Sequence, residues 1–196
     1  MKRNNGLFAH RNSELESNNN FNEGDFSLEL KEIMTEEECG RVLEINQENL
    51  DRNGGQLHYE GILSHTYALL AKHKDDVVGY MLLEEDFIMR GDIYAMQVAI
   101  DNRYKHLGIG SKMCEYAYAH AKGYRFFTAS VNENNTVSQK YHEKNGFQIA
   151  GENNLGLLYV RPIRKDAELS FDGAQPVKFN IDGFGLESKS TEPGEQ

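Results

Sequence analysis

The sequence predicts an α/β fold with a mixed sheet. Short segments with the two-residue alternation of β-strands take turns with segments of helical periodicity along most of the chain. Two of the predicted strands, 67–73 and 77–83, are separated only by Lys74, Asp75 and Asp76, which is the spacing of a β-hairpin. A hairpin adds antiparallel neighbours to a sheet, so the predicted sheet is mixed rather than wholly parallel.

The first predicted elements are a strand and a helix. Residues 26–31 alternate apolar and polar side chains, as a half-buried strand does. Thr35 followed three residues later by Glu38 is a capping box, which predicts a helix that runs to about Leu50. The segment that follows, 56–66, fits a short helix or a loop. The apolar residues expected on the buried side of the helix are Val42, Leu43 and Ile45.

A second alternation of strands and helices follows the hairpin. Gly79 lies inside a strand pattern and indicates a bulge or a close approach of another backbone segment. Gly123 and Gly146 stand where glycines commonly end helices. The pattern predicts strands at 93–100, 125–131, 147–150 and 155–160, and helices at 111–121 and 134–145.

Composition and charge exclude several classes of function. The net charge of −10 argues against nonspecific nucleic-acid binding and is compatible with a cationic substrate, although plain solubility explains it as well. No apolar run is long enough to cross a bilayer, and the N-terminus lacks the apolar core of a signal peptide. Cys39 and Cys114 are too few for a disulfide framework, and the histidines lack metal-ligand spacing. We therefore expect a cytoplasmic protein with no metal, membrane or nucleic-acid partner.

Both ends of the chain differ in composition from its middle. Residues 1–24 are rich in Asn and Ser, so we expect a flexible arm ahead of a main domain at 25–163. The polar extension 164–196 contains one strand pattern near 177–181, where Val177, Phe179 and Ile181 alternate with polar residues. This strand could cover the domain's own sheet, or it could pair with a second copy of the chain in a homodimer.

A glycine-containing turn separates a predicted strand from the helix that follows it. Residues 105–110 read Lys-His-Leu-Gly-Ile-Gly. Such a turn directs free backbone N–H groups and the positive end of a helix dipole toward one point, which suits a phosphate. A diphosphate-bearing cofactor is the first hypothesis, and the alternative is that Gly108 and Gly110 only permit a tight turn. A dinucleotide-binding fingerprint is disfavoured, because Met113 stands where its third glycine belongs.

A second motif lies further along the chain. Asn134 and Tyr141 are two helical turns apart, so both should project from one helix face. Gly146 followed by Phe147 ends that helix. By itself the tyrosine could equally be a core aromatic. Taken together in this order and spacing, the two motifs resemble those of the GNAT superfamily of N-acetyltransferases, over roughly residues 26–163.

The resemblance implies a mostly antiparallel central sheet flanked by helices, with splayed fourth and fifth strands. Three positions depart from the family pattern. Lys105 stands where Arg or Gln is usual, Val137 where Ala is usual, and Asn102 where many members have Pro. Lys105 leaves the backbone cradle intact but changes the side chain that is available to a pyrophosphate.

The resemblance also implies acetyl-coenzyme A as co-substrate and an amine as acceptor. Backbone groups of Val98 and Ile100 would pair with the pantetheine arm, and an amide there would polarise the thioester carbonyl. The turn after the fourth strand would hold the pyrophosphate. The residues expected to bind the cofactor are therefore Val98, Ile100, Lys105, His106, Leu107, Gly108, Ile109, Gly110, Ser111, Asn134 and Tyr141.

The implied reaction is a direct attack of the amine on the thioester, with two proton transfers. Tyr141 is the expected donor to the departing thiolate, because a phenol can hydrogen bond to it and share its proton. Asp92 and Glu85 lie at the ends of predicted strands and are the candidates for the base that deprotonates the amine. A chain of water molecules is the alternative to either carboxylate.

The acceptor has no motif of its own. Acidic and aromatic side chains in segments 50–66 and 86–91 could receive a small cationic amine, such as a polyamine or an aminoglycoside. A protein or peptide amine is the alternative acceptor. A third interpretation, of another class, is a non-catalytic module that binds acyl-coenzyme A.

Overall fold

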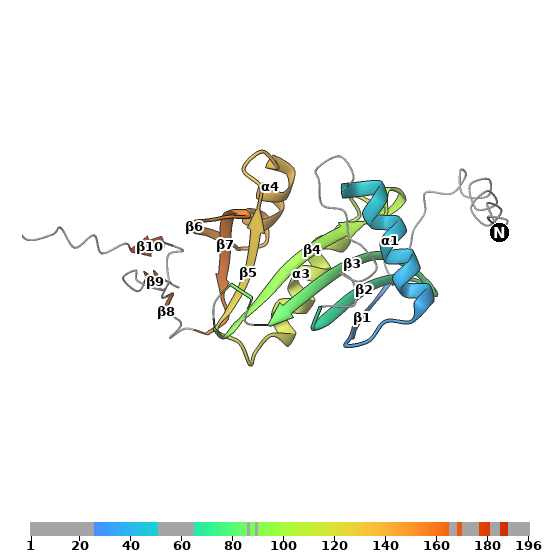
Figure 1. Cartoon of the computed structure of the whole chain (residues 1–196), viewed down its shortest axis with the longest axis horizontal. Coiled ribbons are helices and arrows are strands. Elements are labelled where there is room, and N and C mark those ends of the chain that lie inside the picture. The colour runs from blue at the N-terminus through green and yellow to red at the C-terminus, as the bar shows by residue number, and fades with distance from the viewer. Residues whose placement is uncertain are drawn as a thin grey trace, which may run out of the picture.

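The computed structural model of the chain describes residues 26–50, 65–85, 87–88 and 90–164, and the backbone of three short strands beyond them. Its centre is a seven-stranded sheet in the order β1-β2-β3-β4-β5-β7-β6 (Figure 1). Every neighbouring pair is antiparallel except β4 and β5, which run parallel. The predicted mixed, mostly antiparallel sheet is therefore confirmed.

The elements follow the predicted order, with ends that differ by a few residues. The strands of the main sheet are β1 (Phe26–Lys31), β2 (Tyr67–His73), β3 (Asp76–Glu85), β4 (Asp92–Ile100), β5 (Phe126–Val131), β6 (Gln148–Asn153) and β7 (Gly156–Pro162). The helical elements are α1 (Glu36–Leu50), the short 3-10 helix η3 (Asn102–Tyr104), α3 (Ile109–His120) and α4 (Thr136–Lys144).

Helices α1 and α3 cover opposite faces of the sheet, which we call the α1 face and the α3 face (Figure 1). Successive side chains of a strand point to opposite faces, so each strand contributes to both cores. The core of the α1 face includes Leu70, Tyr80, Leu82, Val42 and Ile45. The core of the α3 face includes Leu69, Met81, Ile93, Met113 and Phe127.

Helix α1 begins with the predicted capping box. The Glu38 amide donates to Thr35 Oγ1 at 3.2 Å, and the Thr35 amide donates to Glu38 Oε2 at 2.8 Å. Lys31 and Lys72 donate to Glu38 Oε1 at 2.9 and 2.8 Å. Burial opposes the charge on Glu38, but these hydrogen bonds outweigh it and lower its pKa to about 2. The carboxylate thus ties α1 to β1 and β2.

Gly79 has both features expected of a glycine inside a strand. The ladder between β2 and β3 shifts register between Ala71 and Lys72, opposite Gly79. A Cβ atom at this position would lie 2.5 Å from Ile100 Cδ1. The missing side chain therefore lets β3 and the end of β4 approach closely.

The start of α4 differs from the prediction. Asn135 caps the helix, and its side chain accepts a hydrogen bond from the Ser138 amide at 3.1 Å. Asn134 precedes the helix, where its amide donates to Asn132 Oδ1 at 2.9 Å. The expectation that Asn134 and Tyr141 share a helix face is therefore wrong. Consecutive asparagines are equally good caps, so the sequence alone could not choose between them.

Some predictions concern residues outside the described ranges, namely the arm at 1–24 and most of the segment 56–66. In the C-terminal extension the backbone forms β8 (Glu168–Leu169), β9 (Val177–Asn180) and β10 (Gly185–Glu187), in a separate sheet ordered β10-β9-β8. The sequence predicted a single strand there, near 177–181. Of the helices that the structure describes, none combines the length and apolar character needed to span a membrane.

Candidate active site

The parallel strands β4 and β5 separate along their length. Their ladder pairs residues 92–94 with residues 126–128 and ends there, although β4 continues to Ile100 and β5 to Val131. Figure 1 shows the two strands diverging beyond this junction. The splayed fourth and fifth strands that the family resemblance implied are therefore confirmed.

The second half of β4 directs main-chain groups toward the gap. The Asp101 amide donates to Val78 O of β3 at 2.9 Å, so it points away from β5. Main-chain groups of successive strand residues point to alternate sides, so those of Ile100 and Val98 point toward β5. This is the orientation that their predicted pairing with the pantetheine arm requires.

The segment after η3 forms a turn in front of α3. His106 and Gly108 have positive φ angles of 65° and 78°. Gly108 is the N-cap of α3, and among the described residues no side chain caps this helix end. The Lys112 amide donates to Gly108 O at 3.1 Å, so the amides of residues 109–111 precede the helical hydrogen bonds. These amides and the positive end of the helix dipole have the arrangement that favours an anion, and we call this part of α3 the predicted anion-binding end.

Side-chain exposure differs along this turn. Lys105, His106 and Leu107 are exposed, and 44% of the Leu107 surface is accessible. Ile109 is buried in the core of the α3 face. Its side chain therefore fixes the first turn of α3 to the sheet, while the residues before it remain open to a ligand. Ser111, in the same turn, is partly buried.

Asp101 anchors the chain between β4 and the turn. Its carboxylate is 1% exposed and accepts from the Arg103 amide at 2.9 Å and from the Arg103 guanidinium at 2.6 Å. Arg41 of α1 forms a further ion pair with it. Burial opposes its ionisation, but these partners lower the pKa of Asp101. Sequence reasoning missed this residue; an Asp two positions before an Arg, just after a strand, was the available signal.

Tyr141 reaches from α4 to the first turn of α3. Its hydroxyl donates to Gly110 O at 2.9 Å. A Cβ atom on Gly110 would lie 3.2 Å from Tyr141 Cε2, so the glycine makes room for the ring. Burial raises the pKa of Tyr141, and the neighbouring Cys114 adds to this effect. The predicted acid thus lies beside the predicted anion-binding end as a protonated phenol.

The two predicted bases face opposite sides of the sheet. Glu85 pairs across the strands with Ile93, the residue after Asp92. Paired residues share a face and successive residues point to opposite faces, so the Glu85 and Asp92 side chains lie on opposite faces. Glu85 Oε1 accepts from the Tyr67 hydroxyl at 3.2 Å and also from the Tyr124 hydroxyl. Asp92 is fully buried, and its Oδ2 accepts from Thr128 Oγ1 at 2.7 Å. Each carboxylate is held by hydroxyl groups, and its role as a base stays a prediction.

Several solved structures share this fold, whereas no protein of curated function matches the sequence. PaiA N-acetyltransferase from Thermoplasma acidophilum, solved in complex with coenzyme A, aligns with a TM-score of 0.57 and 16% identity over 69% of this chain and 99% of that chain. The yncA protein from Salmonella typhimurium, solved with its cofactor acetyl-coenzyme A, aligns with a TM-score of 0.59 and 13% identity over 73% and 96%. The ribosomal-protein-S18-alanine N-acetyltransferase from Escherichia coli aligns with a TM-score of 0.57 and 12% identity over 76% and 99%.

Likeness at these identities shows a shared fold, and the family is shown by the sequence itself. The sequence model of the acetyltransferase (GNAT) family matches residues 29–147. That range contains the splayed β4 and β5, the turn before α3, and Tyr141. The chain therefore belongs to the GNAT family of acetyltransferases, whose co-substrate is acetyl-coenzyme A.

Proposed function

We propose that the protein transfers an acetyl group from acetyl-coenzyme A to a primary amine of a small cationic molecule, by direct attack of the amine. One observation carries the proposal. The uncapped N-terminus of α3 opens beyond the end of the splayed β4, with the Tyr141 hydroxyl bound to its first turn. An anion-binding end, an unpaired stretch of strand and a proton donor then occupy one region.

The residues of this region fit acetyl-coenzyme A, which when bound supplies an acetyl group activated as a thioester. The amides of residues 106–111 suit a pyrophosphate, and the Ser111 hydroxyl adds a donor. The main-chain groups of Val98 and Ile100 suit the amides of the pantetheine arm, as an additional strand would. Lys105 and Asn134 are exposed and are proposed as further contacts.

Tyr141 gives its proton to the sulfur that departs. Its pKa is raised by burial, so the phenol stays protonated at neutral pH and can act as a donor. The hydrogen bond to Gly110 O holds the hydroxyl in place before the sulfur replaces the carbonyl as acceptor. Removal of the amine proton needs a separate group, for which Asp92, Glu85 and a water chain were the predicted candidates.

A small cationic acceptor is favoured by the charge of the chain. With a net charge of −10, the protein attracts cations. A peptide amine is the second candidate, because one of the similar structures is a ribosomal-protein-S18-alanine N-acetyltransferase.

A thiol-release assay with acetyl-coenzyme A tests the proposal. The acceptors are spermidine, kanamycin, free amino acids, and peptides with a free N-terminus or a lysine. We expect release with spermidine or kanamycin and only a background rate without acceptor. Release with peptides alone would identify a peptide N-acetyltransferase. Calorimetric binding of acetyl-coenzyme A without release would support the non-catalytic module, and no binding would contradict the whole proposal.

A further inference from the structure

We propose that Glu84 receives the ammonium group of the acceptor and takes its proton, so that the acceptor binds on the α1 face of the sheet. This inference rests on the proposed acetyltransferase function and names the carboxylate that the function requires. Three observations support it: the strand register of Glu84, the sheet face on which its side chain lies, and one buried carboxylate oxygen that lacks a hydrogen-bond donor.

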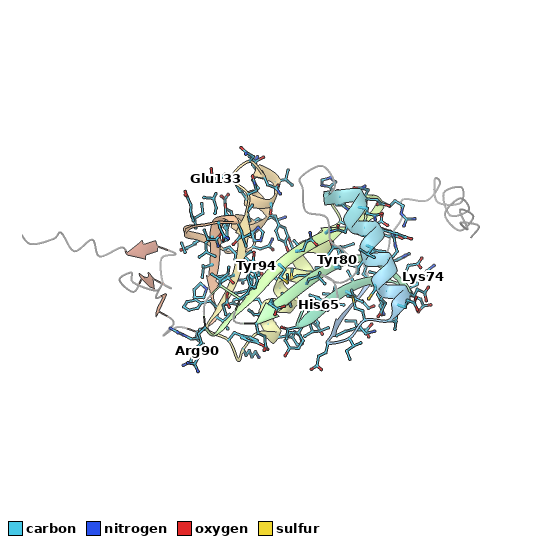
Figure 2. All side chains as sticks on the ribbon, viewed as in Figure 1. His65, Lys74, Tyr80, Arg90, Tyr94 and Glu133 are labelled. Atoms are coloured by element: carbon cyan, nitrogen blue, oxygen red, sulfur yellow. The ribbon has the colours of Figure 1, made fainter. Side chains whose placement is uncertain are left out.

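Glu84 lies beside the point where β4 and β5 separate. Its Cα partner on β4 is Tyr94. Tyr94 is also the last residue of β4 that pairs with β5, through Thr128. Figure 2 labels Tyr94 near this junction. An acetyl group that enters the gap as far as the junction therefore meets Tyr94, with Glu84 on the neighbouring strand.

The side chain of Glu84 lies on the α1 face. Leu82, two residues earlier on β3, packs in the core of that face. Gln97, the strand partner of Leu82, accepts a hydrogen bond from Asn46 of α1 at 3.0 Å. Side chains two residues apart on a strand share a face, so the Glu84 side chain lies on the α1 face with that of Leu82. Glu85 points to the α3 face instead, which separates it from this position.

The turn at residues 105–110, which is proposed to bind the nucleotide, lies on the α3 face of the sheet. Tyr141 packs against the core of the α3 face, and the buried Ile109 fixes the first turn of α3 to the same core. A cofactor bound there occupies the gap from the α3 face. The α1 face of the junction is then the side from which an amine reaches the thioester.

One oxygen of Glu84 is buried without a protein donor. In the part of the chain that the structure describes, no group donates a hydrogen bond to Glu84 Oε2. Glu85, the next residue on β3, differs, because the Tyr67 and Tyr124 hydroxyls both donate to its Oε1. A buried carboxylate oxygen without a donor is costly, so a ligand that brings one is favoured. An ammonium group is such a ligand.

An aromatic pair stands next to this carboxylate. The rings of Phe87 and Tyr94 stack with centroids 4.6 Å apart, and 47% of the Phe87 surface is exposed. Aromatic faces attract organic cations, and an adjacent carboxylate strengthens the attraction. The combination favours a protonated amine over a neutral nucleophile.

Glu84 takes one proton from the bound ammonium and later releases it to water. The freed lone pair of the nitrogen forms the C–N bond as the C–S bond breaks, and the sulfur receives the proton of Tyr141. The nitrogen then loses a second proton, which restores Tyr141 through solvent. Each transfer thus yields an amide and a thiol and releases one proton.

The test compares Glu84→Gln with Glu152→Gln in the thiol-release assay, with spermidine and kanamycin as acceptors. Glu152 is exposed on β6, at the far edge of the sheet, and is the matched control. At about pH 7 we expect Glu84→Gln to lower kcat/KM by about 10²- to 10⁴-fold and the control to leave it unchanged. The affinity for acetyl-coenzyme A, measured by calorimetry, should be the same in both variants.

The pH profile separates proton removal from a structural role. As the pH rises toward the pKa of the amine, solution supplies the uncharged form, so the deficit of Glu84→Gln should shrink. Wild-type rates, a deficit that is constant with pH, a parallel loss of cofactor affinity, or a larger loss in Glu85→Gln or Asp92→Asn would overturn the assignment and leave the proposed function standing. If the wild type releases no thiol with any acceptor, the proposed function fails, and this assignment fails with it.

Discussion

The proposed nucleotide end and the proposed acceptor end of the site are built in different ways. The proposed nucleotide end consists of main-chain groups, namely the amides of residues 109–111 and the unpaired half of β4. The proposed acceptor end consists of side chains around the β4–β5 junction, among them Glu84, Tyr94 and Phe87. Main-chain groups bind with little regard to side-chain identity, whereas a side-chain site loses its chemistry with one substitution. We therefore expect changes at the two ends to affect different measurements.

The largest expected effect separates turnover from binding. Tyr141→Phe removes the proposed proton donor but keeps the ring that packs on Gly110, so kcat should fall by about 10²- to 10⁴-fold with little change in cofactor affinity. Steady-state kinetics and calorimetry measure the two quantities. Tyr116→Phe, on α3 where the ring stacks on His120, is the control. Equal activity of Tyr141→Phe and wild type would remove the hydroxyl from the mechanism.

The next effect concerns the anchor of the nucleotide end. Asp101→Ala leaves Arg41 without its buried partner, so the free energy of unfolding should fall by about 3 to 5 kcal/mol. Urea unfolding measures the loss. Asp75→Ala, exposed in the hairpin turn, should change stability by less than about 0.5 kcal/mol. A small loss for Asp101→Ala would mean that the turn is held by other contacts.

Gly110→Ala tests the contact between the turn and the acid. The added Cβ would lie 3.2 Å from the Tyr141 ring, so the ring must shift, at a cost of about 1 kcal/mol. Because the change touches both α3 and Tyr141, cofactor affinity and kcat should fall together. In Gly123→Ala the added Cβ meets no atom within 4 Å, so both quantities should keep their wild-type values.

The pH dependence of stability should report on α4. His142 is buried, and burial lowers its pKa against the opposing effect of a hydrogen bond with Ser138 O. The unfolded chain therefore binds the proton more readily, so stability should fall as the pH drops below about 6.5, by at most about 1.4 kcal/mol per pH unit. His142→Gln should remove this contribution, whereas His120→Gln, exposed on α3, should retain it.

The smallest effect compares two residues with the same strained backbone. His106 and Lys74 have φ angles of 65° and 57°. Replacement of either by glycine should stabilise the fold by about 0.5 to 1 kcal/mol, because glycine adopts this conformation without a steric penalty. Only His106→Gly should also change the affinity for acetyl-coenzyme A, since Lys74 lies in the hairpin turn. An affinity change in both variants would contradict the assigned position of the turn.

The contrast between the ends also explains what could be predicted from the sequence. The turn at 105–110 and the capping box at Thr35 are local patterns, and the structure has both where they were expected. The choice between Glu84 and Glu85 depends on a strand face and on the register of β3 with β4, which shifts at a bulge after Leu82. The ion pair of Asp101 with Arg41 joins residues 60 positions apart, so no local pattern contained it.

Amide hydrogen exchange of the full chain, with and without coenzyme A, tests the central claim most directly. If the uncapped end of α3 binds the pyrophosphate, the amides of Ile109, Gly110 and Ser111 should become strongly protected, together with those of Val98 and Ile100. The amide of Gly123, at the other end of α3, should exchange as before. Protection confined to another part of the chain, with these five amides unchanged, would contradict the account.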